Sequence, residues 1–283
     1  MKKSFYLIIA MLFITLCLNT FGQANQYPFK VNKSGSGSQS IIFIPGFASS
    51  SDVWNETKSQ YEKQFTCYTL TMAGFAGNPS QANSSFVNWG NAIAKFIKDN
   101  NIEKPIIIGH SMGGGLAMAI AADYPELLSK IIVVDALPCL GALSNPNYVS
   151  KENNDCSNVV NYIKSMTDEQ FKQMQMKSIA SILADTLKHE LVVGWSLKTD
   201  RTTFGNMYCD FMNTDMRDKI STIKCPALIL LEPSFSIIKP KIEEQFKNLK
   251  TAQLEYANKG LHFIMYDDKE WYDMQLNKFI SLK

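Results

Sequence analysis

The stretch from residue 105 to residue 115 constrains the fold of this chain more than any other part of the sequence. An apolar run ends in the pattern Gly-x-Ser-x-Gly centred on Ser111, and small residues then open a helical pattern. We expect a strand, a sharp turn and a helix, with Ser111 in a strained conformation that exposes its hydroxyl above the sheet. Gly109 and Gly113 would let the strand and the helix approach closely, because side chains there would collide. The bare pattern also occurs by chance in ordinary turns, and only its place between a strand and a helix makes it specific.

Residues 1–24 have the pattern of a secretory signal peptide. Two lysines precede an apolar run of about 14 residues, and small residues follow at Gly22 and Ala24. The run is shorter than the roughly 20 residues that a membrane-spanning helix needs. We therefore expect an exported protein, periplasmic or secreted, with no membrane span in the mature chain. A plain N-terminal anchor is one alternative. Another is a lipoprotein modified at Cys17, although Leu16 is larger than such a site normally accepts.

The charge of the remaining 259 residues is balanced. Of the 28 Lys and Arg residues, two lie in residues 1–24, which leaves 26 to face 26 Asp and Glu residues. This balance, without a basic run, gives no electrostatic reason to bind nucleic acid or an anionic membrane. Five cysteines remain at irregular spacing, which fits neither a zinc site nor a disulfide framework. Export would permit one disulfide, for which Cys156 and Cys209 are our guess.

Apolar runs of the buried-strand type alternate with helical patterns along most of the chain. This alternation predicts an α/β fold, a mostly parallel sheet that helices cover on both faces. The regularity breaks between Leu137 and Thr222, where the pattern is helical and rich in methionine. We expect one α/β domain, formed by residues 25–138 and 221–283, with a helical cap inserted at residues 139–220.

A serine hydroxyl becomes a good nucleophile only when a base takes its proton. The chain has three histidines. His110 precedes the serine and is expected to serve local packing, while His189 lies in a helical stretch of the insertion. His262 lies in a loop after the last strand, at the carboxyl edge where parallel sheets collect their sites. We therefore predict that His262 is the general base.

Two carboxylates follow strands at the same edge and could orient this histidine. Asp135 directly follows a buried strand, which suits a rigid orienting role. Glu232 follows the next buried strand and precedes a proline, and it remains the alternative acid. The oxyanion of a tetrahedral intermediate needs two backbone N–H groups. We expect these from Met112, directly after the serine, and from Phe47, in the loop after the first buried strand.

Three motifs in this order resemble the α/β-hydrolase fold superfamily: Pro45-Gly46-Phe47, the elbow around Ser111, and Gly260-Leu261-His262-Phe263. The resemblance implies a nucleophile at Ser111, a base at His262, oxyanion donors at Phe47 and Met112, and a cap over residues 139–220.

The sequence departs from the usual family pattern at the acid. Many members carry the acid in a Gly-x-x-Asp motif after the strand that follows the cap, where this chain has Glu232-Pro233-Ser234-Phe235. Other members place the acid after the strand that precedes the cap, and Asp135 falls there. Asp135 is therefore our preferred acid.

The expected function is that of an exported serine hydrolase that cleaves a carboxylic ester or a related acyl bond through an acyl-enzyme on Ser111. The methionine-rich insertion suggests an adaptable apolar pocket for a small-molecule acyl substrate, and ordinary core packing explains the methionines equally well. A carbon–carbon bond hydrolase or a lactonase would use the same three residues. A non-catalytic binding protein on a hydrolase scaffold is a further alternative. Gly113-Gly114-Gly115 lacks the Lys-Ser/Thr pair of a phosphate loop, and nothing calls for a metal, a nucleotide or a flavin. Nothing indicates an oligomeric state.

Overall fold

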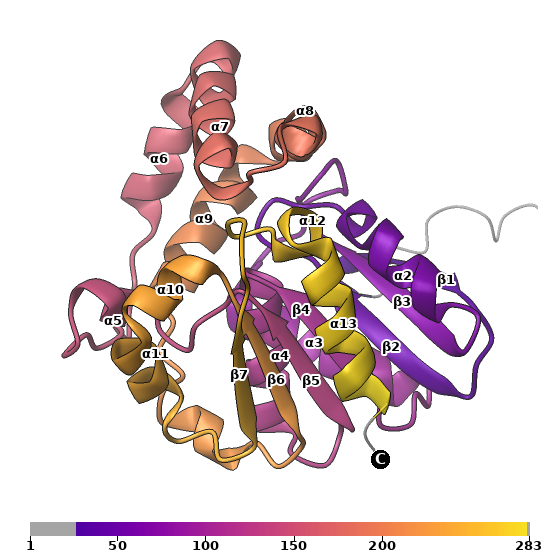
Figure 1. Ribbon diagram of the computed structural model, residues 1–283. Coiled ribbons are helices and arrows are strands. Elements are labelled where there is room, and N and C mark those ends of the chain that lie inside the picture. Colours follow the sequence, from indigo (N-terminus) through magenta and orange to yellow (C-terminus); the bar gives the residue numbers. More distant parts are fainter. Residues whose placement is uncertain (1–26, 282–283) are drawn as a thin grey trace, which may run out of the picture.

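One seven-stranded β-sheet forms the centre of the fold (Figure 1). The computed structural model describes residues 27–281, so the expected signal peptide and Cys17 lie outside the described residues. The strand order is β1-β3-β2-β4-β5-β6-β7, and every pair of neighbours is parallel except β1 with β3. The strands are β1 Phe29–Ser34, β2 Gln39–Ile44, β3 Phe65–Met72, β4 Ile106–His110, β5 Lys130–Val134, β6 Ala227–Leu231 and β7 Ala252–Tyr256.

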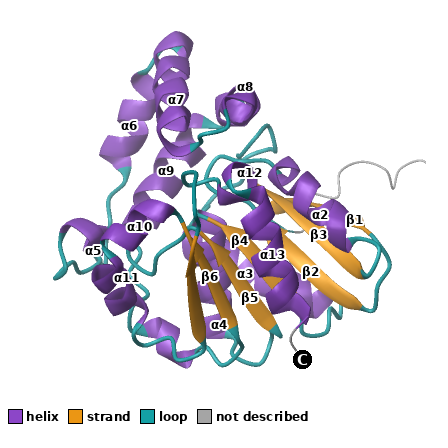
Figure 2. Ribbon diagram, viewed as in Figure 1, coloured by secondary structure: helices purple, strands orange, loops and turns teal. Residues whose placement is uncertain are grey.

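The central strands are apolar on both faces because helices cover both faces of the sheet. In β4, Ile107 packs into the cluster on one face, while Ile106 and Ile108 pack into the cluster on the other. In Figure 2, α13 crosses the front of the sheet and α3 and α4 lie behind it. The helices of the α/β core are η2 Ser51–Trp54, α2 Asn55–Tyr61, α3 Phe86–Asp99, α4 Met112–Asp123, α10 Pro233–Ile237, α11 Lys239–Phe246, α12 Ile264–Asp267 and α13 Lys269–Ser281. The predicted α/β fold with a doubly covered, mostly parallel sheet is confirmed.

The segment between β5 and β6 is helical and carries no strand. Figure 1 shows α6, α7, α8 and α9 above the end of the sheet from which β7 leads into α12. These helices form the cap. The elements of the segment are α5 Gly141–Ser144, α6 Ser157–Ser165, α7 Asp168–Ile182, η3 Thr186–Lys188, α8 His189–Leu197, α9 Arg201–Met212 and η4 Lys219–Thr222.

The cap is held together by a disulfide, a close helix contact and an ion pair. Cys156, just before α6, is bonded to Cys209 in α9, so the guessed pair is confirmed. The two helices approach so closely that a Cβ on Gly205 would lie 2.7 Å from the Cα of Val160. Arg201 of α9 bonds Asp168 of α7 at 3.0 Å, and its guanidinium lies over the Phe171 ring. The cap therefore has its own tertiary contacts.

No helix within residues 27–281 is both long enough and apolar enough to cross a membrane.

Removing the disulfide should destabilise the protein. Because Cys156 and Cys209 are 53 residues apart, the chain-entropy model predicts a loss of about 4 kcal/mol for Cys156→Ser combined with Cys209→Ser. Urea denaturation followed by circular dichroism would measure this loss. Dithiothreitol should lower the midpoint of the wild type to that of the double variant and leave the variant unchanged. Equal midpoints for the two oxidised proteins would contradict the prediction.

Candidate active site

Ser111 occupies the turn between the end of β4 and the start of α4, in a strained conformation. Its φ of 53° and ψ of −122° lie in a region that residues with a side chain rarely adopt. Two backbone hydrogen bonds hold it there: its N–H donates to the carbonyl of Val134 at 2.8 Å, and its carbonyl accepts from Gly115 at 3.0 Å. The expected strand, turn and helix are confirmed, and Ser111 lines a pocket above the sheet.

The glycines of the motif are required by the close packing around this turn. A Cβ on Gly109 would lie 2.1 Å from the carbonyl oxygen of Gly113. A Cβ on Gly113 would lie 2.3 Å from the carbonyl oxygen of Ile44, in the neighbouring strand β2. Both distances are far below van der Waals contact. Any side chain at either position would therefore displace α4 from the sheet.

Asp135 directly follows β5 and contacts His262, which lies 127 residues further along the chain. The Nδ1 of His262 is 2.6 Å from the Oδ2 of Asp135. The Asp135 side chain is buried, and its Oδ1 accepts the backbone N–H of Glu232 at 2.7 Å. Because a carboxylate accepts hydrogen bonds, the proton of a neutral imidazole is held on Nδ1. The other nitrogen, Nε2, is then free to accept a proton.

Asp135 is itself held in a strained conformation. Its φ is 53°, and its backbone N–H donates to the carbonyl of Leu230 at 2.8 Å. The residue is thus tied to β6 through its backbone and to Glu232 through its carboxylate. This anchoring fixes the direction in which the carboxylate meets His262.

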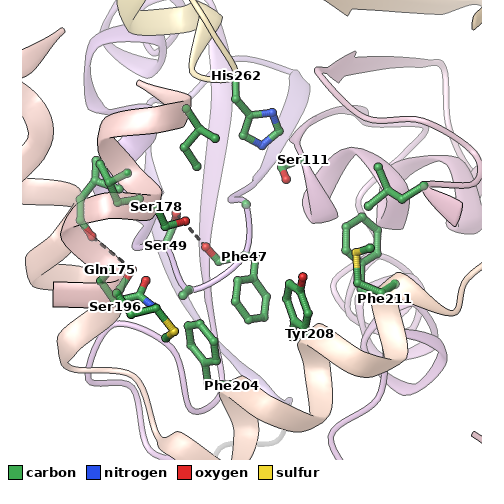
Figure 3. Close-up of a pocket in the computed structure, with 18 of the residues that line it drawn as sticks. Phe47, Ser49, Ser111, Gln175, Ser178, Ser196, Phe204, Tyr208, Phe211 and His262 are labelled. Carbon is green, nitrogen blue, oxygen red and sulfur yellow. Dashed lines mark hydrogen bonds between the residues drawn. The ribbon is translucent and has the colours of Figure 1, made fainter. Parts of the chain in front are cut away.

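Figure 3 shows the His262 ring and the Ser111 hydroxyl at the same end of the pocket. His110, the last residue of β4, is almost completely buried, as its expected packing role requires. Its Nε2 lies 3.0 Å from the backbone carbonyl of His262, so it supports the loop that carries that residue. Burial lowers the pKa of His110 well below its ordinary value, and the nearby His262 adds to this effect. His110 is therefore a neutral structural donor.

The histidine of the cap, His189, does not line the pocket. Its Nε2 bonds the carbonyl of Leu183 at 2.7 Å.

The Glu232 carboxylate lies in a different environment from that of Asp135. It accepts a hydrogen bond from the hydroxyl of Ser234, and within residues 27–281 it makes no hydrogen bond to His262. Burial raises the pKa of the Glu232 carboxyl above its ordinary value. The backbone of Glu232, rather than its side chain, contributes to the site by holding Asp135.

Asp267, the last residue of α12, is a functional residue that the sequence pattern did not predict. Its carboxylate accepts the backbone N–H of Leu261 at 2.8 Å, next to His262. It also accepts the N–H groups of Ala184 and Asp185, in the loop between α7 and η3, at 3.0 and 2.9 Å. Asp267 therefore ties the histidine loop to the cap. The sequence signal for this role was the position of Asp267, an acidic residue only five residues after His262.

Two backbone N–H groups beside Ser111 have no hydrogen-bond acceptor within the described part of the chain. They belong to Phe47, in the loop after β2, and to Met112, the first residue of α4. Buried N–H groups are rarely left unpaired in proteins. The preceding Gly46 brings its loop close to the serine, since a Cβ there would lie 3.2 Å from the Cβ of Ser111. The two groups are available to a negatively charged oxygen.

A pocket of about 760 Å³ lies between the sheet edge and the cap. Aromatic side chains form much of its wall: the Phe47 ring packs edge-on against Phe204 and Tyr208 of α9 (Figure 3). The segment between Leu137 and Thr222 contains six methionines, of which Met174 and Met212 line the pocket. Met207 and Met216 instead belong to the core. The methionine pattern therefore marks packing as much as it marks the pocket.

Within residues 27–281, no group of three or more His, Cys, Asp or Glu side chains is placed to hold a metal ion.

Known proteins resemble this chain in sequence and in structure. A family model described as α/β hydrolase fold matches residues 39–173. A pimeloyl-(acyl-carrier protein) methyl ester esterase of Wigglesworthia glossinidia brevipalpis is 25% identical over 229 residues, which are 80% of this chain and 86% of that protein.

Some relatives match over a much shorter segment. The dihydrolipoyllysine-residue acetyltransferase component of the acetoin cleaving system of Cupriavidus necator is 28% identical over 103 residues, or 36% of this chain. This match spans 28% of the length of that protein. Among solved structures, an esterase of Exiguobacterium antarcticum superposes with a TM-score of 0.73 at 15% identity, covering 90% of this chain and 96% of the esterase. The sequence match over residues 39–173 and the likeness to solved structures agree, and the chain has the α/β-hydrolase fold.

Proposed function

We propose that this protein is a serine hydrolase that cleaves carboxylic esters through an acyl-enzyme on Ser111. The observation that carries the proposal is the 2.6 Å contact between His262 and Asp135 at the end of the pocket where Ser111 stands on its strained turn. A serine, a histidine and a buried carboxylate gathered at one end of a pocket are the groups that nucleophilic acyl transfer requires.

The reaction follows from the roles of these groups. Asp135 accepts the Nδ1 proton of His262, so Nε2 takes the proton of Ser111 as its oxygen attacks the ester carbonyl carbon. The N–H groups of Phe47 and Met112 stabilise the negative oxygen of the tetrahedral intermediate. His262 then returns the proton to the leaving alcohol, and the acyl group remains on Ser111. Water, deprotonated by His262, attacks the acyl carbon and releases the acid.

The relatives support hydrolase activity, and the name of the Wigglesworthia protein points to ester bonds. The pocket is large enough for a small ester, and its aromatic wall suits an apolar part of such a substrate. Carbon–carbon bond hydrolysis and lactone hydrolysis use the same three groups, and no contact in the pocket favours either of them over ester hydrolysis.

We further propose that the protein is exported, as its first 24 residues indicate. The disulfide between Cys156 and Cys209 supports this location, because such bonds persist in oxidising compartments and are rare in the cytosol.

Ser111→Ala should abolish ester hydrolysis and labelling by a fluorophosphonate probe. Without the nucleophile, the acyl-enzyme cannot form, and we expect kcat to fall about 10⁶-fold. Initial rates on p-nitrophenyl esters and gel fluorescence would measure the two effects. Ser221→Ala, which removes an exposed hydroxyl of η4, is the control and should behave as wild type. Hydrolysis at the wild-type rate in the Ser111 variant would disprove the mechanism.

Asp135→Asn should lower kcat about 10⁴-fold, because an amide no longer holds the Nδ1 proton on His262. Glu232→Gln is the matched control: it also turns a carboxylate into an amide, keeps the backbone N–H that holds Asp135, and should change kcat less than about threefold. The same p-nitrophenyl ester assay compares the two variants. A severe loss in the Glu232 variant with normal activity in the Asp135 variant would reverse the assignment of the acid.

Expression of the full chain in a Gram-negative host should place the active protein outside the cytoplasm, with residues 1–24 removed. Cell fractionation and N-terminal sequencing would show this, and a variant with Ile8→Arg and Leu12→Arg in the apolar run is the control that should stay unprocessed in the cytoplasm. An unprocessed wild-type chain in the cytoplasm would contradict the proposal.

A further inference from the structure

Gln175 is a buried polar side chain in the wall of the pocket. The residue is only 5% exposed, and it lines the same pocket as Ser111 and His262. Within the described residues, its side-chain amide has no hydrogen-bond partner. Gln245, which is similarly buried, accepts the backbone N–H of Cys139 at 3.1 Å. An amide that a protein buries without a partner of its own is available to a ligand.

The position of Gln175 on α7 points it inward. Phe171 and Ile179, four residues before and after it, are both buried, so the three residues form one stripe on the inner face of the helix. The helix itself is well anchored, because Thr167 and Gln170 form a capping box at its start. A glutamine thus stands where an apolar side chain would complete the stripe.

The polar groups near Gln175 do not satisfy its amide. In Figure 3, Gln175 lies on the same side of the pocket as Ser49 and Ser196, away from the ring of Tyr208. The Ser49 hydroxyl donates to the carbonyl of Phe47 at 3.3 Å, and the Ser196 hydroxyl donates to the carbonyl of Val192 at 3.4 Å. Both hydroxyls have thus used their proton. Ser178 and Asn158 also line the pocket, but both residues are exposed. Gln175 is the buried residue there whose side chain offers a free donor and a free acceptor together.

The ligand group that would meet this amide is uncharged. Among the described residues, Asp135 is the only Asp or Glu that lines the pocket, and its carboxylate contacts His262. No Lys or Arg of the described residues lines the pocket. A carboxylate on the substrate would lose its hydration without gaining a cationic partner, which makes its binding free energy unfavourable. A keto, hydroxyl or ether oxygen needs only a hydrogen bond.

We propose that Gln175 is a specificity-determining residue that hydrogen-bonds a second, uncharged oxygen of the ester substrate, away from the bond that is cleaved. This assignment rests on the proposed esterase function. The substrates are then neutral esters with a keto, hydroxyl or ether oxygen in the arm that lies beneath α7. Plain alkyl esters are poorer substrates, because they displace water from the amide and return no hydrogen bond.

The test uses Gln175→Met, which keeps the length of the side chain and removes its hydrogen bonds. Two series of substrates vary the position of the second oxygen, so that one of them places it within hydrogen-bond distance of the Gln175 amide. In the first, p-nitrophenyl esters with pentanoyl to decanoyl chains are each compared with keto analogues that carry the oxygen at successive positions. In the second, alkyl pentanoates are compared with alkoxyalkyl pentanoates of equal length in a pH-stat assay. The two series distinguish the acyl arm from the alcohol arm.

For at least one position of the oxygen, the wild type should prefer the oxygenated ester about tenfold in kcat/KM. Gln175→Met should lose this preference through a higher rate on the plain ester and a lower rate on its oxygenated partner. Gln173→Met is the matched control, since Gln173 lies two residues away on the exposed side of α7 and bonds Glu169. It should keep the wild-type preference.

Equal rates of fluorophosphonate labelling in the wild type and both variants would show that the fold and Ser111 are intact. With labelling intact, the same preference in wild type and Gln175→Met, or no preference at any position, would overturn the assignment of Gln175. Absence of labelling and of ester hydrolysis in the wild type would instead refute the esterase function. The two failures are therefore distinguishable.

Discussion

The close approach of β4 and α4 at Ser111 is the constraint on which the rest of the site depends. Glycines at positions 109 and 113 remove the side chains that would push strand and helix apart. The approach holds Ser111 at a φ of 53° and places the N–H of Met112 beside it, at the start of a helix. Such strain persists only where the surrounding structure enforces it. Here β2 and β5 do so, through the close contact of Ile44 with Gly113 and the hydrogen bond from Ser111 to Val134.

The parallel sheet brings the remaining groups to the same edge. The ends of β2, β5 and β7 deliver Phe47, Asp135 and His262, which are far apart in the chain. A network of backbone hydrogen bonds then orients them: Glu232 holds the Asp135 carboxylate, and Asp267 joins the histidine loop to the cap. The site is thus built from polar contacts between loops whose positions the apolar sheet determines.

The cap covers this edge of the sheet with mostly apolar and aromatic side chains, in contrast to the polar loops below it. Its apolar and aromatic side chains line the pocket around Ser111, and electrostatic interactions are stronger beside such an apolar wall than in bulk water. Into this wall α7 inserts one unpaired amide, that of Gln175. Because the disulfide and the Arg201–Asp168 pair tie the cap helices together, the amide is held in place relative to the pocket.

The sequence by itself determined the sheet and the sharp turn that carries Ser111, the proposed nucleophile. Buried parallel strands and a glycine-flanked turn depend on local pattern and on close packing between neighbouring segments. It also led to His262 and Asp135, since both follow strands that end at one edge. The tertiary structure decided what depends on contacts between distant segments. These are the contact of Asp135 rather than Glu232 with His262, the hydrogen bonds by which Asp267 joins the histidine loop to the cap, and the burial of Gln175 in the pocket wall. A polar residue in an apolar stripe was visible in the sequence, but its exposure depends on how α7 packs against the rest of the cap.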